Sequence, residues 1–68
     1  MDRDEACIGR VGVLTVGTRG GDGPGEVHIK IRGGSETFLA WSEKPLPRGA
    51  TVIVIESRGD RAVDVIEW

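Results

Sequence analysis

The sequence predicts a single all-β domain, a small five-stranded barrel without a substantial helix. Hydrophobic and polar residues alternate with a period of two along most of the 68-residue chain, and no stretch keeps a helical period long enough to predict a helix. Eleven glycines beside abundant Val and Ile indicate short strands joined by tight turns. A chain of this length forms one domain, and closing the sheet hides the edges that short strands would otherwise expose.

The first two strands are predicted at residues 8–16 and 26–32. In the first strand, Gly9 and Gly12 would allow a bend or a bulge. The second strand alternates throughout and places aliphatic residues on one face and basic residues on the other: Val27, Ile29 and Ile31 against His28, Lys30 and Arg32. It is the clearest half-buried strand in the sequence.

Three further strands are predicted at residues 36–41, 51–56 and 61–67, after turns at Gly33-Gly34 and Gly59 and an irregular connector punctuated by Pro45, Pro47 and Gly49. Residues 1–7 are left as an N-terminal tail, and residues 8–68 form the barrel domain. Side chains fill the bore of so small a barrel, which leaves no cavity of ligand size.

Charge and composition exclude several classes of protein. The net charge of −2 argues against a nucleic-acid partner, because phosphate binders are usually basic on at least one face. Cys7 is the single cysteine, so no internal disulfide is possible and a reducing compartment is expected. The longest apolar run, residues 52–55, is far shorter than the roughly 20 residues that span a bilayer. The acidic N-terminus is unlike a signal peptide.

The order of short motifs over residues 8–66 resembles the C-terminal OB-fold domain of NfeD-like membrane proteins. Each motif is weak alone, but the ordered set is more specific. The motifs are Gly9-Arg10-Val11-Gly12, Thr15, Gly25-Glu26-Val27, Gly33-Gly34, Ala40-Trp41-Ser42, Leu46-Pro47-Arg48-Gly49, Val52-Ile53-Val54-Ile55-Glu56 and Gly59.

The resemblance implies an OB-fold-like Greek-key barrel that serves as a non-catalytic protein-interaction module. Members of the family usually carry this domain behind transmembrane helices, and some carry a serine protease domain upstream; this chain has neither. The expected partners are stomatin- and flotillin-type scaffold proteins, or a second copy of the chain. The resemblance also implies a role in membrane-protein organisation or quality control. The expected location is the cytoplasm, at the membrane face, with membrane contact only through a partner or through missing transmembrane segments.

No motif predicts a catalytic, cofactor or metal site. The glycine-dense segment 17–25 lacks the Lys-Ser/Thr pair and the following helix of a phosphate loop, so we expect a mobile hairpin loop. His28 is the single histidine and falls on a solvent-facing row, and one His with one Cys cannot form a structural zinc site. The tripeptide Arg58-Gly59-Asp60 is explained by a turn.

The fourth predicted strand, which is apolar on both faces, suggests a working surface. Either Val52 and Val54 or Ile53 and Ile55 must point outward. Outward Ile53 and Ile55, joined by Ile66 and Trp68 from the fifth strand, would form an exposed apolar patch of the kind that marks a partner surface. In the alternative interpretation, the N-terminal tail or the proline-containing connector folds over these residues.

A second function remains open, single-stranded nucleic-acid binding. OB-folds that bind single strands use aromatic and cationic side chains on their second and third strands. His28, Lys30, Arg32 and Trp41 stand at such positions in the sequence. One aromatic residue is a poor stacking platform, and Glu26, Glu36 and Glu43 lie near it in sequence. A third interpretation is a passive fragment whose role belongs to missing segments.

Overall fold

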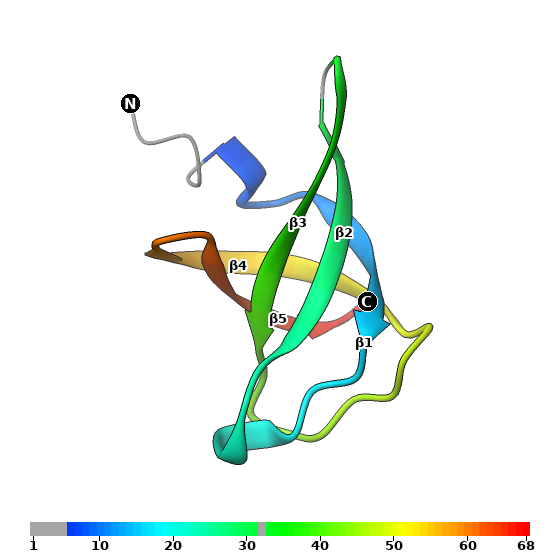
Figure 1. Ribbon diagram of the computed structural model, residues 1–68, viewed down its shortest axis with the longest axis vertical. Helices are drawn as coiled ribbons and strands as arrows, with labels where there is room; N and C mark the ends of the chain where they lie inside the picture. The colour runs from blue at the N-terminus through cyan, green and yellow to red at the C-terminus, as the bar shows by residue number, and fades with distance from the viewer. Residues whose placement is uncertain (1–5, 32) are drawn as a thin grey trace.

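The computed structural model describes residues 6–31 and 33–68, which form a closed five-stranded β-barrel (Figure 1). The strands are β1 (Val11–Val16), β2 (Gly25–Ile31), β3 (Gly34–Trp41), β4 (Thr51–Gly59) and β5 (Ala62–Glu67), with a short 3₁₀ helix, η2 (Gly20–Asp22), between β1 and β2. The all-β barrel predicted from the period-two pattern is thereby confirmed.

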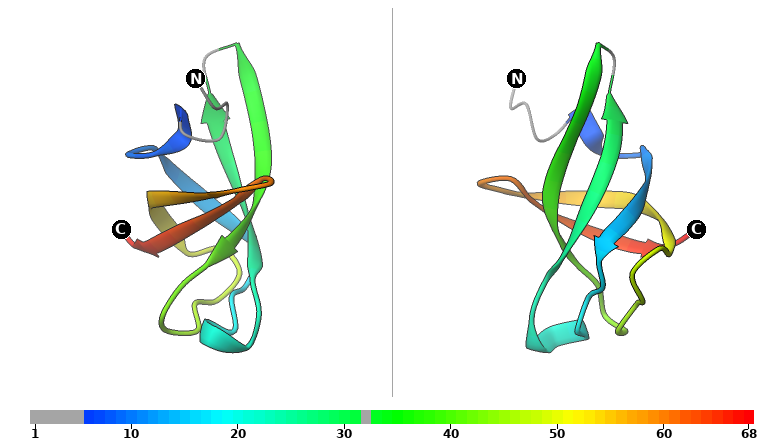
Figure 2. Two further views of the ribbon diagram at one scale, coloured as in Figure 1. Left: turned by 90° about the vertical axis from the view of Figure 1, so that its left-hand side faces the viewer. Right: turned by 45° about the vertical axis from the view of Figure 1, so that its right-hand side comes forward.

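Neighbouring strands follow the order β1-β2-β3-β5-β4, and β4 returns to β1. All pairs are antiparallel except β3 and β5, which run parallel. The long β2–β3 hairpin lies on one side of the barrel and the β4–β5 hairpin crosses behind it (Figures 1 and 2). This is the Greek-key connectivity that the resemblance implied, with the parallel β3–β5 contact made possible by the connector between β3 and β4.

Two strand boundaries differ from the prediction by three residues, and the others agree within two residues. β1 begins at Val11 rather than at residue 8, because Gly9 adopts a φ of +86° and the Arg10 N–H donates to the Cys7 carbonyl at 2.9 Å. β4 continues to Gly59 rather than ending at residue 56, and two irregularities in its pairing with β5 allow the longer strand to follow the curve of the barrel.

The core is a single cluster of aliphatic side chains, with one aromatic ring and one thiol, that fills the bore. Its members are Cys7, Leu14, Val27, Ile29, Phe38, Ala40, Val52, Val54, Val63 and Val65. On β4, the ambiguity left by the sequence is resolved, because Val52 and Val54 are buried and Ile55 is exposed. Cys7 is fully buried, although the sequence assigns it to the N-terminal tail.

The glycine-dense loop before β2 is packed against other backbone segments. A Cβ atom at Gly17 would lie 2.8 Å from the Leu46 carbonyl, and one at Gly25 would lie 2.6 Å from the Gly17 carbonyl. The loop and the β3–β4 connector are also joined by hydrogen bonds between Thr18 and Leu46. The glycines therefore serve close backbone approach, where the sequence suggested mobility.

Candidate interaction surface

An apolar row crosses the outer surface of three adjacent strands. Val11 of β1 pairs with Ile53 of β4, and Ile53 pairs in turn with Ile66 of β5. Val13 and Trp68 lie next to this row, two residues beyond Val11 and Ile66 respectively. The Trp68 N–H donates to the Thr51 carbonyl at 3.0 Å. We call these five residues the ladder face: Val11, Val13, Ile53, Ile66 and Trp68.

Four of the five residues of the ladder face are exposed and Ile53 is half-buried, because they alternate with core residues along their strands. Val11 and Val13 are 41% and 45% exposed, Ile66 is 47% exposed and Trp68 is 71% exposed. Their sequence neighbours, such as Leu14, Val52 and Val65, point inward and are buried. Contiguous exposed side chains of this kind on a small domain mark an interaction surface more often than isolated ones do.

The two margins of the ladder face differ in charge. On the β2 side, Val13 pairs with His28, and Lys30 lies two residues further along β2, level with Val11 in the same register. On the β5 side, Glu43 and Lys44 line a small hollow beside Ile66. Glu67 pairs with the buried Val52 and lies on the opposite face of β5 from Ile66. The surface therefore passes from a basic margin, through an apolar centre, to a margin with one carboxylate and one ammonium group.

A groove of about 590 Å³ opens next to the ladder face, between the β4–β5 hairpin and the segments before β2 and after β3. We call it the Trp41 groove. The large apolar side chains that line the groove are Trp41, Ile55 and Ile66, and its polar lining comes from charged side chains and from loop backbone. The lining includes Trp41, Ile55 and Ile66 together with Gly20, Gly21, Ser42, Glu43, Glu56, Arg58, Asp64 and Val65.

Arg58 and Asp64 fix one wall of the Trp41 groove. The Arg58 guanidinium carbon lies 4.7 Å from the centroid of the Trp41 ring, a cation–π distance. Its Nε and Nη2 atoms lie 2.9 Å and 2.8 Å from the Asp64 Oδ1 atom. Trp41 and Asp64 are also paired in the parallel β3–β5 ladder. The indole is thus held in place by a neighbouring cation while part of it remains in the groove.

The four residues of the predicted apolar patch are divided between these two surfaces. Ile53, Ile66 and Trp68 belong to the ladder face, Ile55 lines the Trp41 groove, and Ile66 borders both. The proline-containing connector leaves Ile55, Ile66 and Trp68 exposed. Residues 1–5, the other cover that the sequence allowed, lie outside the described residues.

Sequence reasoning did not include Val11 and Val13 in the patch. The alternation along the first strand could have indicated that they point outward, because they alternate with Gly12 and Leu14, and Leu14 belongs to the core. What the sequence lacked was the β1–β4 pairing that closes the barrel and places Val11 beside Ile53.

The residues of the predicted nucleic-acid face are not brought together. His28 and Lys30 are exposed on β2, but Trp41 lies four positions beyond Thr37, the β3 partner of His28, which is about 13 Å along the strand. One face of the Trp41 ring is already covered by Arg58. Arg32 lies outside the described residues.

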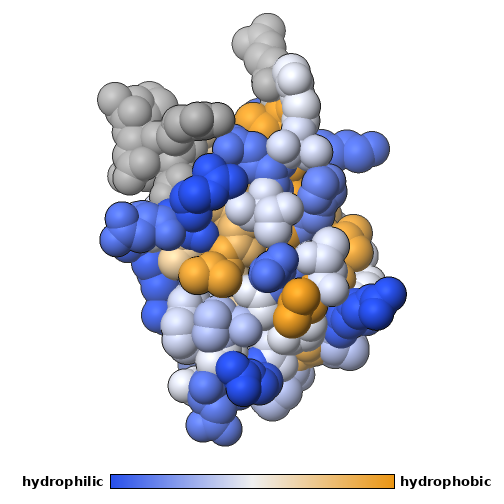
Figure 3. Space-filling view, viewed as in Figure 1, coloured by the Kyte–Doolittle hydropathy of each residue, from blue (hydrophilic) through white to orange (hydrophobic). Residues whose placement is uncertain are grey.

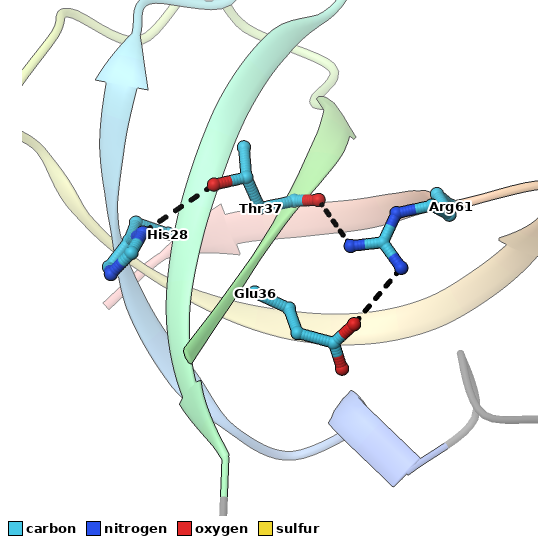
Figure 4. A network of polar contacts seen from close by, with 4 residues as sticks. All are labelled: His28, Glu36, Thr37 and Arg61. Atoms are coloured by element: carbon cyan, nitrogen blue, oxygen red, sulfur yellow. Dashed lines mark hydrogen bonds and ion pairs between the residues drawn. The ribbon is translucent and has the colours of Figure 1, made fainter. Parts of the chain in front are cut away.

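The surroundings of His28 are tied into the barrel by polar contacts (Figure 4). His28 Nδ1 lies 3.5 Å from the Thr37 hydroxyl, and Arg61 donates to the Thr37 carbonyl at 2.9 Å and to the Glu36 carboxylate at 3.0 Å. In the space-filling view over β2 and β3, hydrophobic side chains form separate spots among hydrophilic ones (Figure 3). That side of the molecule therefore offers no continuous stacking platform.

The described part of the chain lacks two further kinds of feature. Among residues 6–31 and 33–68, no three His, Cys, Asp or Glu side chains are grouped so that they could hold a metal ion. No helix in the described part of the chain has the length and apolar character needed to cross a membrane.

Comparison with known proteins places this geometry among related domains. The family model of the NfeD C-terminal domain matches residues 11–66. The soluble domain of the NfeD protein YuaF from Bacillus subtilis, a solution structure, has a TM-score of 0.75 and 29% identity, over 94% of this chain and 75% of that chain. The C-terminal domain of stomatin operon partner protein 1510-C from Pyrococcus horikoshii has a TM-score of 0.68 and 25% identity, over 96% of this chain and 92% of that chain. No curated protein matches this chain in sequence.

Proposed function

The chain belongs to the NfeD C-terminal domain family, and from this premise we propose that it is a non-catalytic module that binds another protein through its outer surface. The family resemblance predicted from the motif order is confirmed by the match over residues 11–66. Side chains fill the barrel interior, so its chemistry is presented on the outside.

The proposed partner is a stomatin-type protein. One structural relative, similar over nearly all of this chain, is named for a stomatin operon partner protein. We extend that association to this chain and assign it a role at the cytoplasmic face of a membrane, in the organisation or quality control of membrane proteins. Membrane contact would then come through the partner or through segments outside this sequence.

The observation that supports this proposal best is the Trp41 groove. A half-buried indole beside two exposed isoleucine side chains gives an apolar centre, and Arg58, Asp64, Glu43 and Glu56 give a polar rim. Protein interfaces commonly have this arrangement, with aromatic anchors in pockets surrounded by polar residues.

The test is a binding measurement between this chain and a stomatin-type protein of the same organism, by isothermal titration calorimetry. Ile55→Lys places a charge in the centre of the groove and is expected to raise the Kd at least about tenfold. The matched control is Leu39→Lys, because Leu39 is 44% exposed, close to the 47% of Ile55, but lies outside the groove.

The control variant is expected to bind within about twofold of the original chain, since a distant surface substitution changes little. Absence of any binding by the original chain would remove the stomatin-type partner. Equal binding by the Ile55→Lys variant would show that the groove is not the docking site.

A further inference from the structure

We propose that the partner segment that fills the Trp41 groove presents an apolar side chain next to a lysine or an arginine. This preference rests on the proposed function, since it takes the groove as the docking site and names the chemistry that the groove selects. The charges that line the groove set the preference, because they are only partly balanced within the chain.

The side chains that line the groove carry an excess of negative charge. Three carboxylates and one guanidinium group, those of Glu43, Glu56, Asp64 and Arg58, give a formal net charge of −2. The guanidinium is already engaged, since its Nη2 atom lies 2.8 Å from the Asp64 Oδ1 atom and its carbon lies 4.7 Å from the centroid of the Trp41 ring. Arg58 is therefore balanced by Asp64, and the excess charge belongs to the two glutamates.

Glu56 lies beside a second carboxylate. It pairs with Asp64 across β4 and β5, so the two side chains stand on the same face of the sheet. The Glu56 Oε1 atom accepts a hydrogen bond from the Ser57 N–H at 3.0 Å, but within residues 6–31 and 33–68 neither Glu56 nor Glu43 makes an ion pair. Like charges directly opposite each other on neighbouring strands are unfavourable. A cation supplied by the partner relieves this repulsion, whereas an anion adds to it.

The apolar lining of the groove lies next to these carboxylates. Ile55 directly precedes Glu56 and is 47% exposed, and the half-buried Trp41 is paired with Asp64. A partner side chain that covers Ile55 removes water from around Glu56, which strengthens the interaction of that carboxylate with a nearby charge. Lys44 lines the small hollow beside Ile66 but does not line the groove. The groove therefore favours an apolar residue with a neighbouring cation over the same residue with a neighbouring anion.

The experiment compares two peptides that differ only in the sign of one charge. The probes are the end-capped pentapeptides Gly-Leu-Leu-Lys-Gly and Gly-Leu-Leu-Glu-Gly, titrated into the isotope-labelled full chain and followed by NMR. We expect the lysine peptide to shift the indole N–H resonance of Trp41 and the amide resonances of Ile55 and Ile66. The glutamate peptide is expected to bind at least about threefold more weakly.

A double variant locates the preference in the two glutamates. Glu43→Gln with Glu56→Gln removes both charges and keeps an oxygen that can accept from the Ser57 N–H, and it is expected to bring the two Kd values within about twofold of each other. The matched control is Glu26→Gln with Asp60→Asn, which removes the same number of charges from exposed positions outside the groove. The control is expected to keep the preference of the original chain.

The proposal is overturned by equal binding of the two peptides, by tighter binding of the glutamate peptide, or by no shift of the Trp41 indole resonance with either. A preference that persists after both glutamates are replaced also overturns it. None of these measurements uses the stomatin-type protein. Loss of the charge preference therefore leaves the effect of Ile55→Lys on that protein as it stands, and failure of that protein to bind leaves the charge preference of the groove as it stands.

Discussion

The hydroxyl of Thr18 lies 2.6 Å from the hydroxyl of Ser42 and joins two loops that are distant in sequence. Ser42 donates to the Lys44 carbonyl at 2.6 Å, and the Leu46 N–H donates to the Thr18 Oγ1 atom at 2.8 Å. Thr18 is only 5% exposed. This chain of hydrogen bonds fixes the β3–β4 connector against the segment before η2. The connector residues Ser42 and Glu43 and the η2 helix that follows Thr18 border the Trp41 groove.

Replacement of Thr18 by Val is expected to destabilise the barrel. Valine keeps the shape of threonine but removes the acceptor of the Leu46 N–H and the partner of Ser42. Leaving a buried donor without a partner costs about 1–3 kcal/mol, which should appear as a lower free energy of unfolding in urea. Thr15→Val is the control, because Thr15 is exposed and its Oγ1 atom lies 3.4 Å from the Glu26 carbonyl. Equal stability of the two variants would contradict a structural role for this network.

Gly25 occupies a position where the backbone leaves no room for a side chain. A Cβ atom there would overlap the Val16 carbonyl and would lie 2.6 Å from the Gly17 carbonyl. Gly25→Ala is therefore expected to lower the free energy of unfolding by more than about 2 kcal/mol, because backbone rather than a flexible side chain must move.

The matched substitution is Gly21→Ala in η2, where no atom lies within 4 Å of the added Cβ. Alanine lowers the chain entropy of the unfolded state. The free energy of unfolding of this variant is therefore expected to stay unchanged or to rise by about 0.4–1 kcal/mol. Thermal denaturation of both variants measures the contrast, and similar losses at the two positions would show that the loop does not pack as described.

The sequence predicted most of the fold because local pattern and tertiary structure agree. On β2, strict alternation placed Val27 and Ile29 inside, and both are buried. On β4 both faces are apolar, so alternation alone could not decide which face is internal. That choice depends on the pairing of β4 with β1 and β5, which is a long-range property.

The candidate surfaces were less predictable than the fold. Ile55 and Ile66 were predicted from the pattern of β4 and β5, but the groove that contains them also needs Trp41 and Gly20 from distant segments. The sequence pattern groups Trp41 with the basic residues His28 and Lys30 of β2. Its actual neighbours, Arg58 and Asp64, become close only through the parallel β3–β5 pairing, for which single-strand periodicity carries no signal.

The β4–β5 turn contains two residues in the left-handed region, Asp60 with a φ of 50° and Arg61 with a φ of 60°. The Arg61 guanidinium bonds Glu36 and the Thr37 carbonyl, and it lies 4.9 Å from the centroid of the Phe38 ring. The contacts of the side chain therefore compensate for an unfavourable backbone conformation.

A pair of substitutions separates these two contributions. Arg61→Ala and Arg61→Gly both remove the guanidinium, but only glycine adopts a positive φ without a steric cost. The glycine variant is therefore expected to be about 1 kcal/mol more stable than the alanine variant in urea unfolding. At exposed Lys44, which is not among the residues with positive φ, the glycine variant should be no more stable than the alanine variant. An alanine variant at Arg61 that matched or exceeded the glycine variant would contradict a strained turn.

Cys7 offers a direct test of where the barrel begins. The sequence ends a tail at this residue, whereas in the structure it is fully buried beside the core. A buried thiol reacts with a polar disulfide reagent only when the surrounding structure opens, so labelling should be slow in buffer and at least about a hundredfold faster in denaturing urea. Moving the thiol to an exposed position, in a Cys7→Ala, Ser35→Cys double variant, should give rapid labelling without urea. Equally rapid labelling of Cys7 in buffer would show that the segment before β1 is not packed into the core.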